Sequence, residues 1–484
     1  MKTKSPVHWL AILAAAAVLG ACGNGTIDVR DIVPDEVTNG DPSNAIYLAI
    51  TSHEDGQVIT GSRTITLAGT VTSATEITAA TLTATLNGGD PVTLDVEEGA
   101  FSVDLTLSDR DNVIAVLAEY QGESYEANFS LNYPFLAFDN GQDAAVVIGQ
   151  PDFTSSGSGL SATGLNGPWG NPTVANDILY VPDYWNNRIL GYYGIPTTHG
   201  AAADFVLGQS DFTSNESLLE RGGLSGPISV AIHGETMALI DFDHKRVLIY
   251  HGLPTTTGAE PDVVIGQEDF TSNETACTAD RLNADSVWLT ENKLLVADAG
   301  QHRVLIWNGI PTEHGTPADL VLGQESFTEC DSGTGASRLN LPYDIWSDGE
   351  RVVVTDSDNY RVLIWNTFPT TNGQAADVVL GQEDMDTSAS GDPSDSTFAW
   401  GAFVTSNGNQ LFIGDCGARV LIWDAFPEEN NVPADRVLGS ATFENPPGGT
   451  TKSSLNCPSG LHVNHNQLIV SDSGNNRVMI FEAP

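Results

Sequence analysis

Short apolar runs, each bounded by Gly, Asn, Asp or Pro, fill most of the chain after residue 140. The clearest unit, residues 339–382, contains the runs LNLPYDIW, RVVVTD, RVLIWN and ADVVLGQ, with polar connections between them. Val, Ile, Leu and Trp dominate these runs, and no stretch of helical length repeats its apolar residues every 3.6 positions. The pattern predicts four short β-strands per unit and an all-β protein.

The same unit occurs six times. An Arg followed by an apolar run recurs every 57 or 58 residues, at Arg188, Arg246, Arg303, Arg361, Arg419 and Arg477. An apolar pair followed by Gly-Gln alternates with it, at Gly149, Gly208, Gly266, Gly323, Gly381 and Gly439, and Ser440 replaces the last Gln. A fixed period of this length with four strands per unit is typical of a β-propeller, whose four-stranded blades surround a channel.

The order of the two phrases indicates how the ring closes. The first strand, at 144–150, lacks the three strands that should precede it, and the last unit ends at 477–481 without its outer strand. Pairing the two completes a sixth blade and removes two exposed sheet edges. We therefore expect a six-bladed propeller over residues 134–484, closed by pairing of 144–150 with 478–481.

Three stretches resemble NHL-type propeller repeats: Leu295-Val-Ala-Asp-Ala-Gly-Gln-His-Arg-Val, Val354-Thr-Asp-Ser-Asp-Asn-Tyr-Arg-Val and Val470-Ser-Asp-Ser-Gly-Asn-Asn-Arg-Val. The resemblance runs from about residue 140 to the end. It implies the propeller fold and leaves the function open, because such propellers serve as enzymes, binding modules and scaffolds.

Two further residue types occur once per unit, and we interpret both as structural. An Asp precedes each Arg, at Asp183, Asp241, Asp298, Asp356, Asp415 and Asp472. We expect it to accept backbone N–H groups two residues on, while the Arg pairs with a carboxylate. An aromatic residue ends each Arg strand, at Tyr192, Tyr250, Trp307, Trp365, Trp423 and Phe481, where core packing is expected.

The first 21 residues have the features of an export signal. Lys2 and Lys4 precede an apolar run at 9–19 that is too short to span a membrane well and leads into Leu-Gly-Ala-Cys. This ending resembles a bacterial lipobox. The resemblance implies cleavage before Cys22, lipidation of that residue and, because Gly23 follows it, an outer-membrane location. We expect an exported, lipid-anchored protein with a signal peptide at 1–21 and a tether at 22–43.

Residues 44–133 alternate apolar and polar positions through seven short segments, which predicts a β-sandwich. The phrases Thr51-Ser-His-Glu-Asp-Gly and Leu67-Ala-Gly-Thr-Val resemble bacterial Ig-like domains of cell-surface proteins. This part of the chain has no Cys, so it lacks the disulfide between sheets that many Ig domains have. The resemblance implies a spacer or an adhesive module, and we expect a spacer.

The charge balance narrows the choice of partners. The chain has 63 acidic and 19 basic residues, a net charge of −44, which would repel phosphate groups. We therefore expect no nucleic-acid partner and no membrane contact except through the lipid anchor. No cofactor is predicted, although a structural divalent cation could bind among the carboxylates.

Four cysteines remain after Cys22, which allows three pairings. Cys277 and Cys330 lie in equivalent connections from one unit to the next. Cys416 lies in a turn between the second and third strands, and Cys457 lies just before the following inner strand. Both connection types emerge at the same end of a blade, so the register predicts the disulfides Cys277–Cys330 and Cys416–Cys457. Their spacing does not fit a thiol metal site.

No catalytic motif is present, so two classes of function stay open. In the first, the propeller is a binding or scaffolding module for a protein or glycan, and aromatic residues that break the repeat contact the partner: Trp169, Tyr184, Trp185, Tyr343 and Trp400. In the second, it is a metal-dependent lactonase or lyase with Asp344 and His462 at the channel mouth. We favour binding, and note that the same aromatic residues could instead close the channel.

Overall fold

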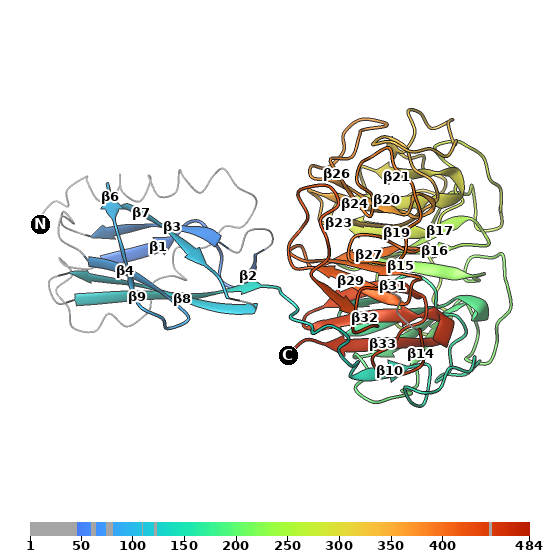
Figure 1. Cartoon of the computed structure of the whole chain (residues 1–484), viewed down its shortest axis with the longest axis horizontal. Helices are drawn as coiled ribbons and strands as arrows, with labels where there is room; N and C mark the ends of the chain where they lie inside the picture. The colour runs from blue at the N-terminus through green and yellow to red at the C-terminus, as the bar shows by residue number, and fades with distance from the viewer. Residues whose placement is uncertain (1–45, 60–63, 74–80, 109, 121–122, 445–447) are drawn as a thin grey trace, which may run out of the picture. The chain divides into compact units, whose positions relative to one another are not determined.

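The computed structural model describes residues 46–59, 64–73, 81–108, 110–120, 123–444 and 448–484 (Figure 1). The predicted signal peptide at 1–21, the lipidation site Cys22 and the tether at 22–43 lie outside these ranges. Within them, no helix has the length and apolar character needed to cross a membrane.

The chain divides into two compact units. The first comprises residues up to 54, 66–104 and 114–129, and the second comprises 55–65, 105–113 and 130–484.

The strands up to residue 133 form two sheets, drawn in blue in Figure 1. The first sheet contains, in spatial order, β1 (Ile46–Ile50), β3 (Thr64–Ser73), β7 (Ala100–Thr106) and β6 (Val96–Glu97). The second contains β2 (Gln57–Val58), β9 (Glu123–Tyr133), β8 (Arg110–Tyr120), β4 (Thr81–Leu86) and β5 (Val92–Leu94). All seven predicted strands are present, and β2 and β6 are additional. Buried positions alternate with more exposed ones along β4 and β7, so each of these strands has one face toward a core.

Six four-stranded antiparallel sheets make up the rest of the described chain. The first three are β11 (Thr173–Ala175), β12 (Ile178–Asp183), β13 (Arg188–Tyr193), β14 (Phe205–Leu207); β15 (Pro227–His233), β16 (Thr236–Asp241), β17 (Arg246–His251), β18 (Val263–Ile265); and β19 (Ser286–Thr290), β20 (Lys293–Asp298), β21 (Arg303–Trp307), β22 (Leu320–Leu322). The next two are β23 (Pro342–Ser347), β24 (Val352–Asp356), β25 (Arg361–Trp365), β26 (Val378–Leu380); and β27 (Phe403–Ser406), β28 (Leu411–Asp415), β29 (Arg419–Trp423), β30 (Arg436–Leu438).

The last sheet joins the two ends of this unit. It contains β10 (Val146–Ile148), β33 (Arg477–Glu482), β32 (Gln467–Asp472) and β31 (Pro458–Asn464). In β10, Val146 lies opposite Ile480 and Ile148 lies opposite Val478, so the predicted closure is confirmed. One edge strand of each sheet contacts the corresponding strands of the two neighbouring sheets. These strands are, in order around the ring, β11, β15, β19, β23, β27 and β31, and β31 contacts β11. The sheets therefore form a closed ring, which is a β-propeller.

The aromatic residue of each unit is buried, as predicted. The indole N–H groups of Trp307, Trp365 and Trp423 donate at 2.9–3.0 Å to carbonyl groups in the connections that follow their strands. Tyr192 is the equivalent residue of the first unit, and its buried hydroxyl group has no hydrogen-bond partner among the described residues.

The Asp–Arg pair of each unit is also buried and bonded, and it links segments rather than only shaping a turn. Arg188 Nε donates to Asp183 Oδ2 at 2.8 Å, and Asp183 Oδ1 accepts the backbone N–H of Asn166, 17 residues earlier. The expectation of a bond to the N–H two residues on is therefore wrong for Asp183, and it holds for Asp415, which accepts the N–H of Gly417. Burial raises the pKa of Asp183 despite its Arg partner.

Short 3-10 helices fill four of the connections between second and third strands: η2 (Tyr184–Asn186), η3 (Ala299–Gln301), η4 (Ser357–Asn359) and η5 (Ser473–Asn475). Each ends in a residue with a left-handed backbone conformation, such as Asn187 with φ 52° and Tyr360 with φ 51°. These helices and the segments that lead into the first strands emerge at the same end of the sheets, because the strands are antiparallel.

Candidate functional site

The end of the propeller that carries η2 to η5 also carries both disulfides, and we call it the cysteine face. The structure pairs Cys277 with Cys330 and Cys416 with Cys457, with Cα–Cα distances of 6.2 and 3.8 Å. Both predicted pairs are therefore found. The first joins the segments that lead into β19 and β23, and the second joins the β28–β29 connection to the segment before β31.

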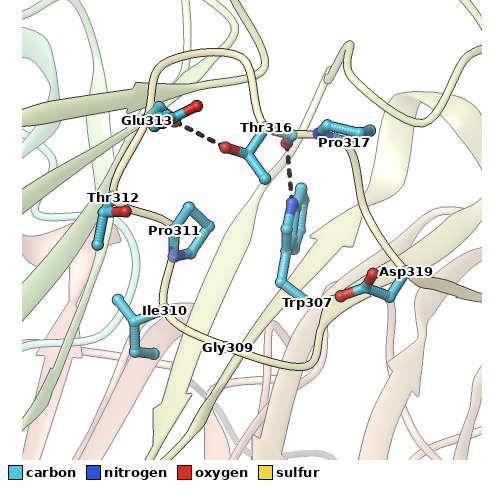
Figure 2. A pocket seen from close by; sticks show the side chains of 9 residues that line it. All are labelled: Trp307, Gly309, Ile310, Pro311, Thr312, Glu313, Thr316, Pro317 and Asp319. Atoms are coloured by element: carbon cyan, nitrogen blue, oxygen red, sulfur yellow. Dashed lines mark hydrogen bonds between the residues drawn. The ribbon is translucent and has the colours of Figure 1, made fainter.

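At the opposite end, a small pocket lies within the connection between β21 and β22 (Figure 2). Trp307, Pro311 and Thr316 line it, and Trp307 Nε1 donates to the carbonyl oxygen of Thr316. The equivalent bonds of Trp365 and Trp423 show that this loop geometry belongs to the repeat. The pocket is therefore a structural feature, since a specific site is built from residues that differ between units.

Asp344 lies in β23, one of the strands that line the channel, and it is fully buried. Its Oδ1 atom accepts hydrogen bonds from Ser286 Oγ at 2.5 Å and from Asn171 Nδ2 at 2.9 Å. Its Oδ2 atom accepts the backbone N–H of Val404 at 2.8 Å. One carboxylate thus connects three sheets of the ring with the segment before β11. Burial raises its pKa to about 6, and the hydrogen bonds oppose that shift.

The segment before β11 extends into the channel and brings Asn171 to Asp344. Gly170 has φ 89°, and a Cβ atom there would lie 1.1 Å from the carbonyl oxygen of Ile228, so only glycine fits. The N–H of Gly170 donates to Ser459 at 2.6 Å, and Asn171 Oδ1 accepts the N–H of Leu461 at 2.9 Å. These bonds link the segment before β11 to β31 of the last sheet and, through Asn171, to Asp344.

His462 is half-buried in β31, and its Nε2 atom accepts the backbone N–H of Val174 at 3.2 Å. Burial lowers its pKa to about 4, so the ring is neutral at pH 7. His462 and Asp344 share no hydrogen-bond partner among the described residues. Both oxygen atoms of Asp344 already accept hydrogen bonds inside the ring, and the alternative role of Asp344 and His462 in a metal site stays a prediction.

Among the described residues, no three His, Cys, Asp or Glu side chains are grouped so that they could hold a metal ion. Catalysis by a metal at Asp344 would require the carboxylate to give up its bonds to Ser286, Asn171 and Val404. The arrangement at this position therefore supports a structural role.

The predicted aromatic residues do gather on the cysteine face, in two groups. In the first, Tyr343 lies edge-on to Trp400 at 5.1 Å and nearly parallel to Phe403 at 6.5 Å, measured between ring centroids. Trp169 contacts Phe403 at 5.8 Å from the other side of the ring. Trp169 therefore packs against an aromatic residue of another sheet, and the closure of the channel mouth by Trp169 stays a prediction.

The second group surrounds η2. Tyr184 contacts Trp185 at 4.7 Å and Phe242 at 6.3 Å, and a Cβ atom on Gly226 would lie 2.8 Å from its ring. Trp185 is 64% exposed and Trp400, in the first group, is 40% exposed. Large exposed indoles beside ordered aromatic rings are typical of a binding surface.

Asp285, which lies just before β19 on the same face, is not among the site residues predicted from the sequence. It precedes Ser286 as Tyr343 precedes Asp344, so the two occupy equivalent positions in neighbouring sheets. Its side chain is half-buried and accepts no hydrogen bond from any described residue. The sequence feature that could have identified Asp285 is its acidic side chain, because the neighbouring units have Ile228 and Tyr343 at the equivalent position.

Comparison with known proteins agrees with the propeller fold. The family model of the NHL repeat matches residues 455–481, the region of the last sheet. No curated protein matches the chain. A protein of unknown function from Bacteroides thetaiotaomicron aligns over 92% of this chain and 100% of its own, with 11% identity and a TM-score of 0.41. A provisionally named 6-phosphogluconolactonase from Bacteroides uniformis aligns over 83% and 91%, with 11% identity and a TM-score of 0.37. With such low scores, the fold assignment rests on the strand pairing.

Proposed function

We propose that the chain is an exported, lipid-anchored protein of the cell envelope whose six-bladed propeller binds a protein or glycan partner through the cysteine face. In this proposal, residues 44–133 are an Ig-like spacer that separates the propeller from an anchor at Cys22. The observation that carries it is the exposure of Trp185 and Trp400 on the face that also holds both disulfides. The backbone N–H of Cys416 donates to the carbonyl oxygen of Trp400 at 3.2 Å, so the Cys416–Cys457 disulfide restrains the backbone at Trp400, which lowers the entropy lost when a partner binds.

Binding is favoured over catalysis by the state of the channel. A lactonase or lyase on this fold would need convergent groups with free coordination or proton-transfer sites. The oxygen atoms of Asp344 are bonded to two other sheets and to the segment before β11, and His462 accepts a backbone N–H. The exposed aromatic surface lies above this closed channel.

Cross-linking tests the binding surface with a matched pair of positions. Trp185 and Tyr193 are 64% and 58% exposed, but they lie at opposite ends of β13 and hence on opposite faces. A photo-cross-linking amino acid at position 185 should capture a partner in intact cells, and the same amino acid at 193 should not. The same amino acid at position 400 provides a second test. Equal capture from 185 and 193, or no capture from either 185 or 400, would contradict the proposal.

The anchor has a separate test. Cells that produce the protein are labelled with a radioactive fatty acid, and the label should appear on wild-type protein but not on Cys22→Ala. Label that persists in Cys22→Ala would exclude Cys22 as the acceptor, and fractionation of the envelope would then show whether the outer-membrane location holds.

A further inference from the structure

Three side chains beside the β15–β18 sheet are arranged like a Ser-His-Asp triad. His244 Nδ1 lies 2.8 Å from Asp241 Oδ2, and His244 Nε2 lies 3.5 Å from Ser217 Oγ. Asp241 ends β16, His244 lies in the connection from β16 to β17, and Ser217 lies in the connection from β14 to β15. The arrangement thus contains a nucleophile, a base and a residue that orients the base, as acyl transfer requires.

The bonds of Asp241 determine which nitrogen atom of His244 carries the hydrogen. Arg246 Nε donates to Asp241 Oδ2 at 2.7 Å, and the backbone N–H of Ser225 donates to Oδ1 at 2.6 Å. A carboxylate paired with an arginine accepts hydrogen bonds and donates none, so the hydrogen atom of the neutral imidazole lies on Nδ1. His244 Nε2 is then the acceptor that faces the hydroxyl group of Ser217.

The base is buried and the nucleophile is accessible. His244 is 6% exposed, whereas Ser217 is exposed to solvent. The distance of 3.5 Å between Nε2 and Oγ is longer than an ordinary hydrogen bond. Such bonds are often long in an enzyme without its substrate and shorten in the complex.

His244 is the residue of this group that differs from the repeat. Three other units have an Asn at its position, which donates to the Asp of its own unit at 2.8 Å: Asn186, Asn359 and Asn475. The hydroxyl group recurs eight residues after the Gly-Gln phrase, at Ser158, Ser217, Thr275, Ser332 and Ser390. No other unit has a His three residues after its Asp, so only this unit combines the hydroxyl group with a base.

The backbone beside Ser217 is held by side chains of the first unit. The N–H of Glu216 donates to Gln209 Oε1 at 3.1 Å, and Gln209 Nε2 donates to the carbonyl oxygen of Glu216 at 2.8 Å. Asn187 Nδ2 donates to the carbonyl oxygen of Asn215 at 2.8 Å. A nucleophile held in this way loses little conformational freedom when a substrate binds.

The aromatic group around η2 adjoins the triad. Phe242 lies in the same connection as His244, and its ring contacts Tyr184 at a centroid distance of 6.3 Å. The bond between Asn187 and Asn215 joins the end of η2 to the segment that carries Ser217. The nucleophile therefore has aromatic side chains nearby, which suits a substrate with an apolar or ring-shaped group.

We propose that Ser217 and His244 are the catalytic residues of an esterase site on the cysteine face, and that Asp241 positions His244. The inference adds an activity to the proposed binding surface. The site lies outside the channel, so the bonds that occupy Asp344 and His462 do not affect it. Because Ser217 is exposed, the site excludes little water, and a carboxylic ester fits it better than the less reactive amide.

The reaction has two steps. In the first, Ser217 Oγ attacks the carbonyl carbon of the ester, and the hydroxyl proton passes to His244 Nε2. The bond from that carbon to the alkoxy oxygen then breaks, and the alcohol leaves with the proton from His244. In the second step, water attacks the acyl group on Ser217 with His244 again as the base, which releases the carboxylic acid and returns a proton to Ser217 Oγ.

Labelling of the purified full chain with a fluorophosphonate tests the nucleophile. An activated serine forms a bond to phosphorus and displaces fluoride, while the base takes up the hydroxyl proton. Ser217→Ala removes the nucleophile, and His244→Asn removes the base but supplies the residue that three other units have, so the fold is retained. The control is His251→Asn, which removes an exposed His at the opposite end of β17.

We expect mass mapping to find the label on Ser217 in wild type and in His251→Asn, at equal rates. His244→Asn should be labelled at least about tenfold more slowly, and Ser217→Ala should not be labelled. For hydrolysis of p-nitrophenyl acetate, kcat/KM should fall at least about tenfold in both test variants. No label on Ser217 in wild type, an unchanged rate in His244→Asn, or unchanged ester hydrolysis by Ser217→Ala would overturn the proposal.

A second pair of variants separates the positioning role of Asp241 from its role in the fold. Asp241→Asn and Asp298→Asn each disrupt a buried bond of 2.7 Å to the Arg of the unit, so both should lower the melting temperature to a similar extent. Only Asp241→Asn should also slow the labelling of Ser217, because Asp241 holds His244. Equal labelling rates in the two variants would overturn the assignment of Asp241.

Discussion

Arg477 Nη1 donates a 2.6 Å hydrogen bond to the backbone carbonyl oxygen of Phe153, a residue 324 positions away in the sequence. In the third unit, the equivalent bond joins Arg303 to Phe327, only 24 positions away. The same local interaction therefore connects consecutive segments in one unit and the two ends of the propeller in another.

This pair of arginines gives the first prediction. Arg477→Lys and Arg303→Lys should each lower the free energy of unfolding by about 3–5 kcal/mol, because lysine cannot bond the buried carboxylate and the carbonyl groups together. In Arg477→Lys alone, hydrogen exchange should also increase in β10, since that strand pairs with β33. Equal exchange of β10 in both variants would show that Arg477 is not a specific link in the closure.

The second prediction concerns the carboxylate at the centre of the ring. Asp344→Asn should destabilise the fold by about 2–4 kcal/mol, because its new N–H₂ group would face a donor such as the N–H of Val404. Ser286→Ala removes only one donor to Asp344 and should cost about 1–2 kcal/mol. Denaturant unfolding measures both values, and a neutral Asp344→Asn would contradict the role of Asp344 as a hub between sheets.

Tyr192→Phe provides a third test. The hydroxyl group of Tyr192 is buried without a partner, so its removal should leave stability unchanged or raise it by about 1 kcal/mol. The matched variant Trp307→Phe removes an indole whose N–H is bonded to Thr316 and should destabilise by about 1–3 kcal/mol. Thermal unfolding of the two variants should therefore shift in opposite directions or, at least, differ clearly in size.

The fourth prediction follows from the pKa of Asp285. Its folded-state pKa of about 8 lies above the usual value of 3.8, so the protonated carboxyl group favours the folded state below pH 4. That contribution is lost as the pH rises toward 8. Asp285→Asn does not ionise, so its stability relative to wild type should rise from about pH 4 to pH 8 and level off above that, by a total of about 3–6 kcal/mol. Melting temperatures of both proteins across this range measure the difference, and a constant gap would contradict it.

The disulfides give the fifth prediction. They close loops with sequence separations of 53 and 41 residues, so each restricts the unfolded chain by about 4 kcal/mol in the loop-entropy model. The double variants Cys277→Ser with Cys330→Ser, and Cys416→Ser with Cys457→Ser, should therefore lower the melting temperature to a similar extent, and reduction should do both. Mass mapping of unreduced protein would contradict the pairing if it found Cys277 linked to Cys416 or Cys457.

Most of the propeller could be predicted because the sequence features that specify its strands and turns are local and recur in every unit. Each unit contains short apolar strands separated by turns, and its Asp–Arg pair mostly bonds groups that lie close in the sequence. One clear unit therefore identifies the others. The Asp–Arg prediction missed one detail: Asp183 bonds the N–H of Asn166. That partner precedes the strand, and its position depends on how the incoming segment folds back.

The aromatic residues of the cysteine face could be predicted from the sequence because they differ between units. Trp169, Tyr184, Trp185, Tyr343 and Trp400 break the repeat, and the face on which each lies follows from its position between strands. Which of them line the channel mouth and which are exposed depends on ring contacts across different sheets. The sequence therefore did not distinguish Trp169, which packs against Phe403, from Trp185, which is exposed.

The sequence by itself determined the repeat, the four strands of each unit, the closure of the ring and the pairing of the cysteines, because period and register are properties of neighbouring residues. Only the tertiary structure decided which hydrogen-bond partners the side chains of Asp344 and Asp285 have. Asn171 reaches Asp344 across 173 residues of chain, and such a partner is set by the shape of the closed ring. These two acidic residues of neighbouring units thus differ because Asp344 accepts hydrogen bonds from Asn171, Ser286 and Val404, whereas Asp285 accepts none from any residue that the structure describes.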